Sequence, residues 1–181
     1  MSKKSNPLHI PSRMGEPDEV DYSDPGGDDF EALSRDTVLV RTLMEDDLPH
    51  LTDIDRRNTG RDRTPYYTQK LKEVLDESGV RVSLVAELDG RPVGFVMARI
   101  DFGEFGQAQP EAVMDTIGVH PDHRAQKIGN ALMSQLLTNL SALQIEKVRT
   151  EVAWNNFDLL KFFERCGFSP SQRLPFRLRV G

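Results

Sequence analysis

The chain has 181 residues, with 29 acidic and 23 basic side chains, a formal net charge of −6 and a single cysteine. This length suits one domain with a substantial core, and the acidic balance lacks the clustered basic face that nucleic-acid binding normally needs. One cysteine permits no internal disulfide, and the sequence has no charged, apolar leader and no apolar run of about 18 residues that could span a membrane. The cytoplasm is therefore the expected location.

The first 36 residues differ in composition from the rest of the chain. They contain four prolines, nine acids and four bases, with only scattered apolar residues. Such a segment cannot bury enough apolar surface to offset the entropy of ordering, so residues 1–36 are expected to form an acidic, disordered tail. Without it, 20 acids and 19 bases remain. Residues 37–181 are therefore expected to form one nearly neutral domain.

The next segment, up to residue 77, predicts a strand and two helices. Val38–Arg41 is apolar and rich in β-branched residues, which favours an opening strand. Acids at Glu45–Asp47, just before Pro49, favour a helix start because negative charge suits the positive end of the helix dipole. Tyr66–Glu77 follows a proline and carries apolar residues at helical spacing, so a second helix is expected to lie over a sheet.

Arginines gather between these two helices, from Arg56 to Arg63. Asp53, Asp55 and Asp62 flank them, which favours an ordinary solvated cluster of paired charges. The alternatives are a patch for an acidic ligand and a nucleic-acid contact, which would show salt-sensitive affinity.

Residues 82–119 predict a hairpin and a central strand. Val82–Leu88 and Pro92–Ile100 are β-rich and are joined by Asp89-Gly90, which is a strong hairpin signal. A loop at Phe102–Pro110 leads to the central strand, Val113–Val119. Gly118 within that strand indicates a bulge.

The turn after the central strand is the most informative stretch. The chain passes through Pro121 and Arg124 into a helix in which Ile128, Leu132, Leu136 and Leu140 recur every fourth residue. The first amide groups of a helix lack partners, and together with the positive end of the dipole they suit a phosphate. Gly129 lacks a Cβ and would let a ligand approach. The alternative is an ordinary strand-to-helix turn.

The rest of the chain predicts a βαβ unit and a final strand. Lys147–Val152 alternates in polarity, which favours a strand. Because a helix connects the central strand to it, the two strands should be parallel, with a right-handed crossover. An apolar helix follows Asn156 and ends before Gly167, a C-cap, and Phe176–Val180 is expected to close the sheet. The sequence thus predicts a mixed α/β sheet, antiparallel on both sides of one parallel pair.

His120 and His123 have no further ligands at suitable spacing, so no metal site is expected. Cys166, which lies at a helix end, fits a small core residue better than a nucleophile.

The segment Gln126–Ala131 resembles the Gln/Arg-x-x-Gly-x-Gly/Ala signature of the GNAT superfamily of N-acetyltransferases. As in that family, a Val-x-Pro-x-x-Arg pattern precedes it, at Val119, Pro121 and Arg124. The strand, Asn-led helix and terminal Gly-Phe also resemble the family, so the likeness covers about Val38 to Val180. It implies one GNAT-like domain with a mixed, mostly antiparallel sheet, a central splayed pair of parallel strands and flanking helices.

The resemblance also implies acetyl-CoA as acetyl donor and a primary amine as acceptor, either a protein or peptide N-terminus or a small amine. The amine would attack the thioester directly in a ternary complex, with no metal, nucleic acid or membrane involved, and a homodimer is common in the family. The oxyanion would be held by the amide of Val119. The cofactor-binding residues implied are Ile117, Gly118, Val119, Arg124, Ala125, Gln126, Lys127, Ile128, Gly129, Asn130, Ala131, Asn156 and Phe163.

Two carboxylates are candidates for the base that removes a proton from the amine. Glu151 resembles, by position, the glutamate that serves as base in ribosomal-protein N-terminal acetyltransferases. Asp115, on the neighbouring strand, is the second candidate, and two carboxylates across one cleft could raise the pKa of one of them. The alternative for each is a carboxylate that faces solvent. For Arg124, the alternative to cofactor binding is a surface salt bridge to Asp122. For Asn156, the alternative is a plain N-cap.

The sequence departs from the family pattern at three positions. Phe163 replaces the tyrosine that protonates the leaving thiolate in many members, so water or another hydroxyl, such as that of Tyr66 or Tyr67, would have to serve. Otherwise the domain would catalyse poorly, and a CoA-binding sensor or regulatory module is the alternative function. Ala125 and Lys127 replace common glycines, which predicts weakened rather than lost phosphate binding.

Overall fold

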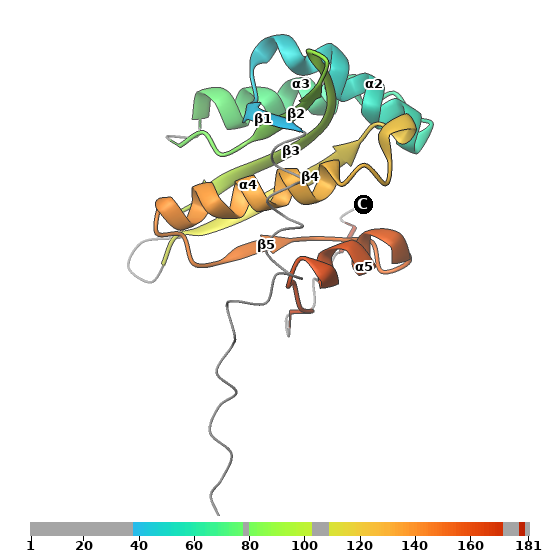
Figure 1. Cartoon of the computed structure of the whole chain (residues 1–181). Helices are drawn as coiled ribbons and strands as arrows, with labels where there is room; N and C mark the ends of the chain where they lie inside the picture. Colours follow the sequence, from blue (N-terminus) through green and yellow to red (C-terminus); the bar gives the residue numbers. More distant parts are fainter. Residues whose placement is uncertain (1–37, 78–79, 103–108, 172–177, 180–181) are drawn as a thin grey trace, which may run out of the picture.

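The computed structural model describes residues 38–77, 80–102, 109–171 and 178–179. The predicted tail, residues 1–36, lies outside them. Within this part of the chain, the strands form one sheet in the order β1-β2-β3-β4-β5 (Figure 1). Neighbouring strands are antiparallel except for β4 and β5, which are parallel. The strands are β1 Leu39–Thr42, β2 Leu84–Leu88, β3 Arg91–Asp101, β4 Glu111–Val119 and β5 Val148–Thr150.

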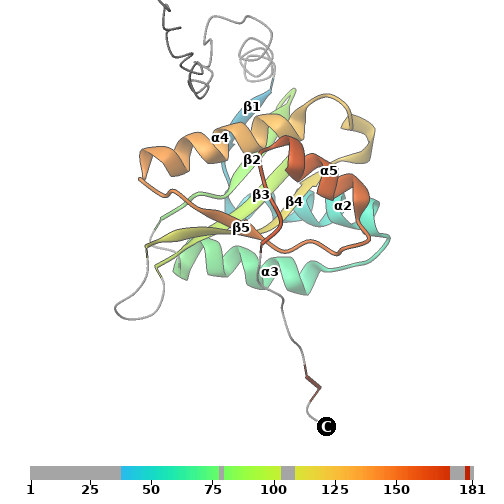
Figure 2. The ribbon, with the colours of Figure 1, turned by 90° about the horizontal axis from the view of Figure 1, so that it is seen from below.

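Helices cover both faces of this sheet. Figure 2 shows α2 and α3 on one side and α4 and α5 on the other. The predicted second helix is α-helical only as far as Lys72 and continues as a π-helical turn, Glu73–Glu77. Among the described helices, none is long and apolar enough to cross a membrane. The helices are α2 Leu48–Thr59, α3 Thr64–Lys72, α4 Ile128–Ala142 and α5 Phe157–Arg165, with short 3-10 turns at Glu45–Asp47 and Pro121–His123.

Each face of the sheet has its own apolar core. On the α4 face, the predicted stripe is buried against alternate residues of the central strands, as the every-fourth-residue pattern indicates. On the other face, α2 and α3 cover Val85, Phe95 and Met97 with Leu51, Ile54, Tyr67 and Leu71. The two cores cover opposite faces of the same sheet.

Two sequence predictions about topology are confirmed. Asp89 and Gly90 join β2 to β3 with φ angles of 50° and 73°, which is the left-handed pair that a two-residue hairpin turn requires. Helix α4 connects β4 to β5, and these two strands are parallel. The βαβ unit places β4 between β3 and the edge strand β5.

The predicted bulge at Gly118 is wrong, because the bulge lies at Asp115. Met97 of β3 pairs with Thr116 of β4, whereas Ala98 pairs with Met114, so Asp115 is the extra residue. Gly118 has a different role, since a Cβ there would lie 2.8 Å from the ring of Phe95.

The second half of the sheet is shorter than predicted. Only Val148–Thr150 of the predicted Lys147–Val152 strand pairs with β4. The predicted closing strand, Phe176–Val180, lies outside the described residues apart from Leu178 and Arg179, which are not in a strand. The interior of the Phe102–Pro110 loop, residues 103–108, also lies outside them. Among the described strands, antiparallel neighbours therefore occur on only one side of the parallel pair.

Candidate functional site

The parallel strands β4 and β5 pair over only three residues each before they part. Ala112–Met114 pairs with Val148–Thr150, and the Thr150 Oγ1 donates to the Met114 carbonyl at 2.9 Å. Beyond this point β4 continues to Val119, while the chain after β5 turns away into α5 (Figure 1). The described part of the chain provides no strand partner for the last residues of β4 on this side, which leaves an opening between β4 and α5.

The amides of Ile117 and Val119 face this opening. His120 donates its amide hydrogen to the Val93 carbonyl on β3 at 2.8 Å, so the amide of His120 points toward β3. Because backbone groups alternate along a strand, the amides of residues 117 and 119 point the other way. They can therefore donate to a ligand that enters between β4 and α5.

A cavity of about 570 Å³ occupies this opening. It is lined by the end of β4, by the turn that follows, by the first turn of α4 and by one face of α5. The lining residues are Ile117, Gly118, Val119, His123, Arg124, Ala125, Lys127, Ile128, Gly129, Asn130, Leu159, Phe162 and Arg165.

Most of the predicted cofactor-binding residues line this cavity, and four do not. Ala131 lies on the buried face of α4. Gln126 is exposed, and its side chain lies near His123. The Asn156 side chain accepts a hydrogen bond from the Leu159 amide at 3.3 Å, so it caps α5 as its alternative interpretation predicts. Phe163 is buried and packs against Phe162 and Phe168.

Sequence reasoning missed the contribution of α5 to the cavity wall. Leu159, Phe162 and Arg165 all line it and are spaced three residues apart on one side of the helix. That spacing is visible in the sequence, whereas the family resemblance implies Phe163. Phe162 also explains Gly129, because a Cβ at Gly129 would lie 3.2 Å from the Phe162 ring. The glycine is therefore needed for packing of α5 against α4.

The turn before α4 is conformationally strained. Ala125 and Lys127 have φ angles of 65° and 58°, in the left-handed region. For a residue with a Cβ, this conformation costs about 1–2 kcal/mol. The glycines common in the family at these positions would adopt it readily. Lys127 also occupies the N-cap of α4, and its ammonium group cannot accept a hydrogen bond from the first amides of the helix.

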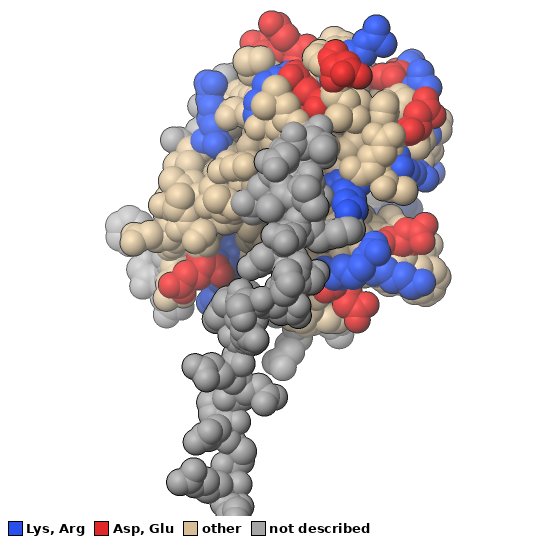
Figure 3. Space-filling model, viewed as in Figure 1, with Lys and Arg blue, Asp and Glu red and all other residues tan. Residues whose placement is uncertain are grey.

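The charge on the cavity wall is positive. Arg124, Lys127 and Arg165 all contribute to the lining, and no acidic residue does so. Figure 3 shows Lys and Arg side chains gathered at the edge where the turn before α4 and α5 meet. Together with the amino-terminal end of α4, these groups form a site that suits a polyphosphate.

The two candidate bases have different surroundings. Glu151 directly follows the last paired residue of β5 and is exposed. Asp115 is the bulge residue of β4, and its carboxylate accepts two hydrogen bonds from Arg99, at 2.6 Å and 2.7 Å, with Lys70 Nζ at 3.8 Å. Asp115 is thus bound to cations rather than to a second carboxylate.

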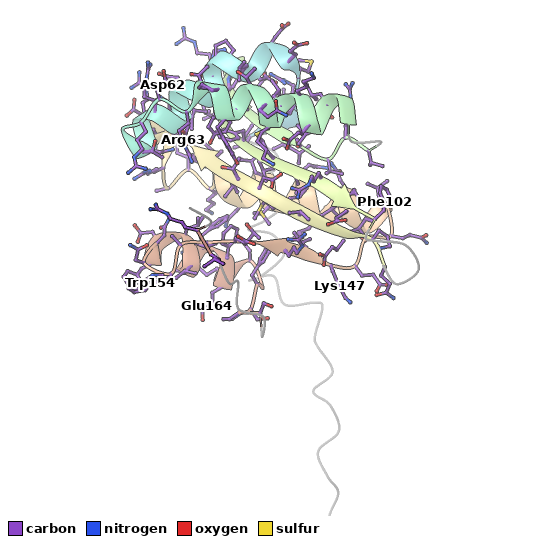
Figure 4. The ribbon with its side chains drawn as sticks, turned by 180° about the vertical axis from the view of Figure 1, so that it is seen from behind. Asp62, Arg63, Phe102, Lys147, Trp154 and Glu164 are labelled. Atoms are coloured by element: carbon purple, nitrogen blue, oxygen red, sulfur yellow. The ribbon has the colours of Figure 1, made fainter. Side chains whose placement is uncertain are left out.

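A polar cluster lies where α2 and α3 meet, near the opening. The Tyr67 hydroxyl is fully buried and donates to Asp55 at 3.0 Å, and Arg63 forms an ion pair with the same carboxylate. Burial raises the pKa of Tyr67 well above its usual range, so this hydroxyl keeps its proton. Tyr66 is partly exposed. Figure 4 shows Arg63 and Trp154 on opposite sides of the opening.

Two further arginines of this region are paired. Arg56 and Arg57 each form an ion pair with Asp53, at 2.8 Å, as expected for a solvated charge cluster. No group of three or more His, Cys, Asp or Glu residues that could hold a metal ion occurs in the described ranges.

Comparison with known proteins identifies the family to which this arrangement corresponds. Residues 42–168 match the family described as acetyltransferase (GNAT) family. The structure is similar to aminoglycoside N-acetyltransferase AAC(6′)-Iy in complex with CoA, with a TM-score of 0.65 and 18% sequence identity, over 78% of this chain and 94% of that chain.

Two further solved structures have the same fold. Ribosomal-protein-alanine N-acetyltransferase from Brucella melitensis biovar Abortus 2308 matches with a TM-score of 0.62 and 23% identity, over 79% of this chain and 99% of that one. Aminoglycoside 6′-N-acetyltransferase AAC(6′)-Ih from Acinetobacter baumannii matches with a TM-score of 0.65 and 18% identity, over 80% of this chain and 99% of that one.

Proposed function

The chain belongs to the GNAT family of acetyltransferases, and on this premise we propose that it transfers an acetyl group from acetyl-CoA to a primary amine by direct attack in a ternary complex. The observation that carries the proposal is the cationic cavity at the point where β4 and β5 part. In one continuous space it offers cationic side chains that can bind phosphate groups and strand amides that can donate to a ligand. The similar AAC(6′)-Iy structure contains CoA, which supports the same class of donor.

In this proposal the cofactor lies along the cavity from α4 to the end of β4. The diphosphate binds the first amides of α4, with Arg124, Lys127 and Arg165 supplying positive charge. The pantetheine arm continues between β4 and α5, where Leu159 and Phe162 give it an apolar wall. The thioester then lies beside the end of β4, and the Val119 amide stabilises the tetrahedral oxyanion.

Glu151 is the proposed base, acting directly or through one water. An exposed carboxylate beside the strand opening can accept a proton from the attacking amine. Asp115 is the weaker candidate, because a base must exchange protons and the Asp115 carboxylate is bound by Arg99 and Lys70. We assign Asp115 the role of fixing the bulge in β4.

The identity of the amine affects the energy cost of deprotonation. At pH 7, removing a proton from a lysine amine costs about 4.6 kcal/mol, whereas an α-amine costs about 1.2 kcal/mol. A single exposed carboxylate serves the second case better, so the proposed acceptor class is an amine of low pKa, such as a peptide N-terminus. Tyr66, whose ring lies beside the Arg63 guanidinium, and the exposed Trp154 are available to contact a peptide chain.

The leaving thiolate has no hydroxyl donor at residue 163. A thiol pKa near 8.5 makes the thiolate a tolerable leaving group, so water can protonate it. The buried Phe163 is also the observation that favours a second candidate, a module that binds acetyl-CoA without efficient turnover.

One experiment separates the two candidates. Release of free CoA thiol from acetyl-CoA would be measured across a panel of peptides and polyamines, with mass spectrometry of the products. Acetylated product with at least one amine supports the enzyme. Tight acetyl-CoA binding with thiol release at background across the whole panel would instead establish the binding module.

A further inference from the structure

The Asn58 side chain joins three separate elements beside the proposed cofactor cavity. It lies in the last turn of α2, and its Nδ2 donates to the carbonyl of Val119, the last residue of β4, at 2.9 Å. Its Oδ1 accepts a hydrogen bond from the Arg124 guanidinium at 2.6 Å. Because one partner is an acceptor and the other a donor, only one orientation of the amide satisfies both.

Both partners of Asn58 belong to the cavity wall. Val119 ends the strand whose free amides face the opening, and Arg124 lies in the turn that leads to α4. The two contacts join residues 61 and 66 positions apart in the sequence. Asn58 therefore fixes the position of a cavity-lining cation relative to the end of the strand that lines the same cavity.

Arg124 is oriented by a side-chain amide rather than by a carboxylate. Arg41, Arg63, Arg99 and Arg149 each form an ion pair with a carboxylate. Within the described residues Arg124 forms none, and the predicted alternative, an ion pair with Asp122, does not occur; Asp122 lies near His120 instead. A neutral amide thus orients the guanidinium and leaves its positive charge uncancelled.

We propose that Asn58 is a positioning residue for the cofactor site, one that holds the Arg124 guanidinium ready for a phosphate group while preserving its charge. This inference rests on the proposed function. An arginine side chain held in place before binding loses less freedom when it binds, so affinity increases. The choice of asparagine over aspartate is itself part of the inference, because a carboxylate could accept from Arg124 but could not donate to the Val119 carbonyl, and it would neutralise the guanidinium.

The test compares Asn58→Ala with Asn58→Asp. Acetyl-CoA affinity would be measured by titration calorimetry, and folding stability by urea denaturation. Asn58→Ala should weaken binding about fivefold, as expected for loss of one orienting hydrogen bond. Asn58→Asp should weaken it further, because it places a negative charge beside the phosphates and its oxygens cannot donate to the Val119 carbonyl, while the urea midpoint shows that the variant is folded. Asn139→Asp, which adds the same charge on α4 away from the cavity, should bind like wild type.

A double substitution provides the second readout. In an Arg124→Ala background, Asn58→Ala should cause little further loss of affinity, because the group that it positions is absent. The inference is overturned if Asn58→Asp binds acetyl-CoA as tightly as Asn58→Ala, or if Asn58→Ala has the same effect with and without Arg124. Wild-type protein that fails to bind acetyl-CoA would overturn the proposed function itself, which separates the two failures.

Discussion

Arg99 donates from one guanidinium nitrogen to both carboxylate oxygens of Asp115, at 2.6 Å and 2.7 Å. The pair links β3 to β4 at the residue that forms the bulge, and Lys70 from α3 lies 3.8 Å away. The bulge changes which strand amides face the opening between β4 and β5. The ion pair thus connects the packing of α3 to the geometry of the proposed site.

Asp115→Asn is expected to reduce stability more than it reduces the chemical step. Loss of a charge-assisted hydrogen bond to a largely buried group costs about 1–3 kcal/mol. Urea denaturation should show this loss, while the maximal rate under acetyl-CoA saturation should fall less than tenfold. A rate loss of a hundredfold or more with unchanged stability would return Asp115 to the role of base.

Glu151→Gln is expected to lower the maximal rate by about 10²- to 10⁴-fold at neutral pH, the usual contribution of a general base. Acetyl-CoA affinity should stay within twofold of wild type, because Glu151 lies outside the cavity lining. Steady-state kinetics with an active amine, combined with calorimetry, measures both quantities. The matched control is Asp158→Asn at an exposed position of α5, which should leave the rate unchanged. A full rate in Glu151→Gln would remove Glu151 from the mechanism.

Ala125→Gly is expected to stabilise the protein by about 0.5–1 kcal/mol. Relief of left-handed strain, about 1–2 kcal/mol, exceeds the added entropy of the unfolded chain. The same substitution at Ala131, a right-handed and buried position in α4, should destabilise by about 1 kcal/mol. Chemical denaturation of the two variants tests the sign, and destabilisation by Ala125→Gly would show that the left-handed turn is not strained.

The Arg41–Asp47 pair predicts a loss of stability in acid. Burial alone would raise the pKa of Asp47, but hydrogen bonds from Arg41 and from the Met44 amide outweigh it, and the pKa lies below its ordinary value. The carboxylate is therefore charged and stabilising above the unfolded-state pKa of about 3.9, and this stability is lost as pH falls through the lower, folded-state pKa.

Urea midpoints measured from pH 7 down to about pH 3 provide the check. Asp47→Asn should be less stable than wild type at pH 7, and the difference between the two proteins should shrink as the pH falls. A difference that stays constant over the whole range would exclude Asp47 from the acid sensitivity.

Much of the fold is predictable because its signals are local. The Asp89-Gly90 turn adopts the two positive φ angles that these residues favour, and the stripe from Ile128 to Leu140 identifies the buried face of α4. The turn at Gln126–Ala131 is recognisable because backbone amides at a helix start need few specific side chains. Most of the cavity wall follows from this segment and from the end of β4.

The features that escaped sequence reasoning depend on contacts between distant segments. The bulge is at Asp115 because the registers of β3 and β4 shift there, and register is a property of two strands. Asn58 meets Arg124 only after α2 has packed beside the end of β4. Phe162 rather than Phe163 lines the cavity because of the rotation of α5 against α4, which no local pattern specifies.

Hydrogen–deuterium exchange, measured by mass spectrometry with and without saturating acetyl-CoA, tests the central claim most directly. If the diphosphate binds the first amides of α4 and the thioester arm lies along β4, peptides covering residues 117–131 should gain the strongest protection. Peptides from α2 other than its last turn, and from β1, should exchange at the same rate in both states. Protection confined to other segments, or none despite measured binding, would contradict the proposed site.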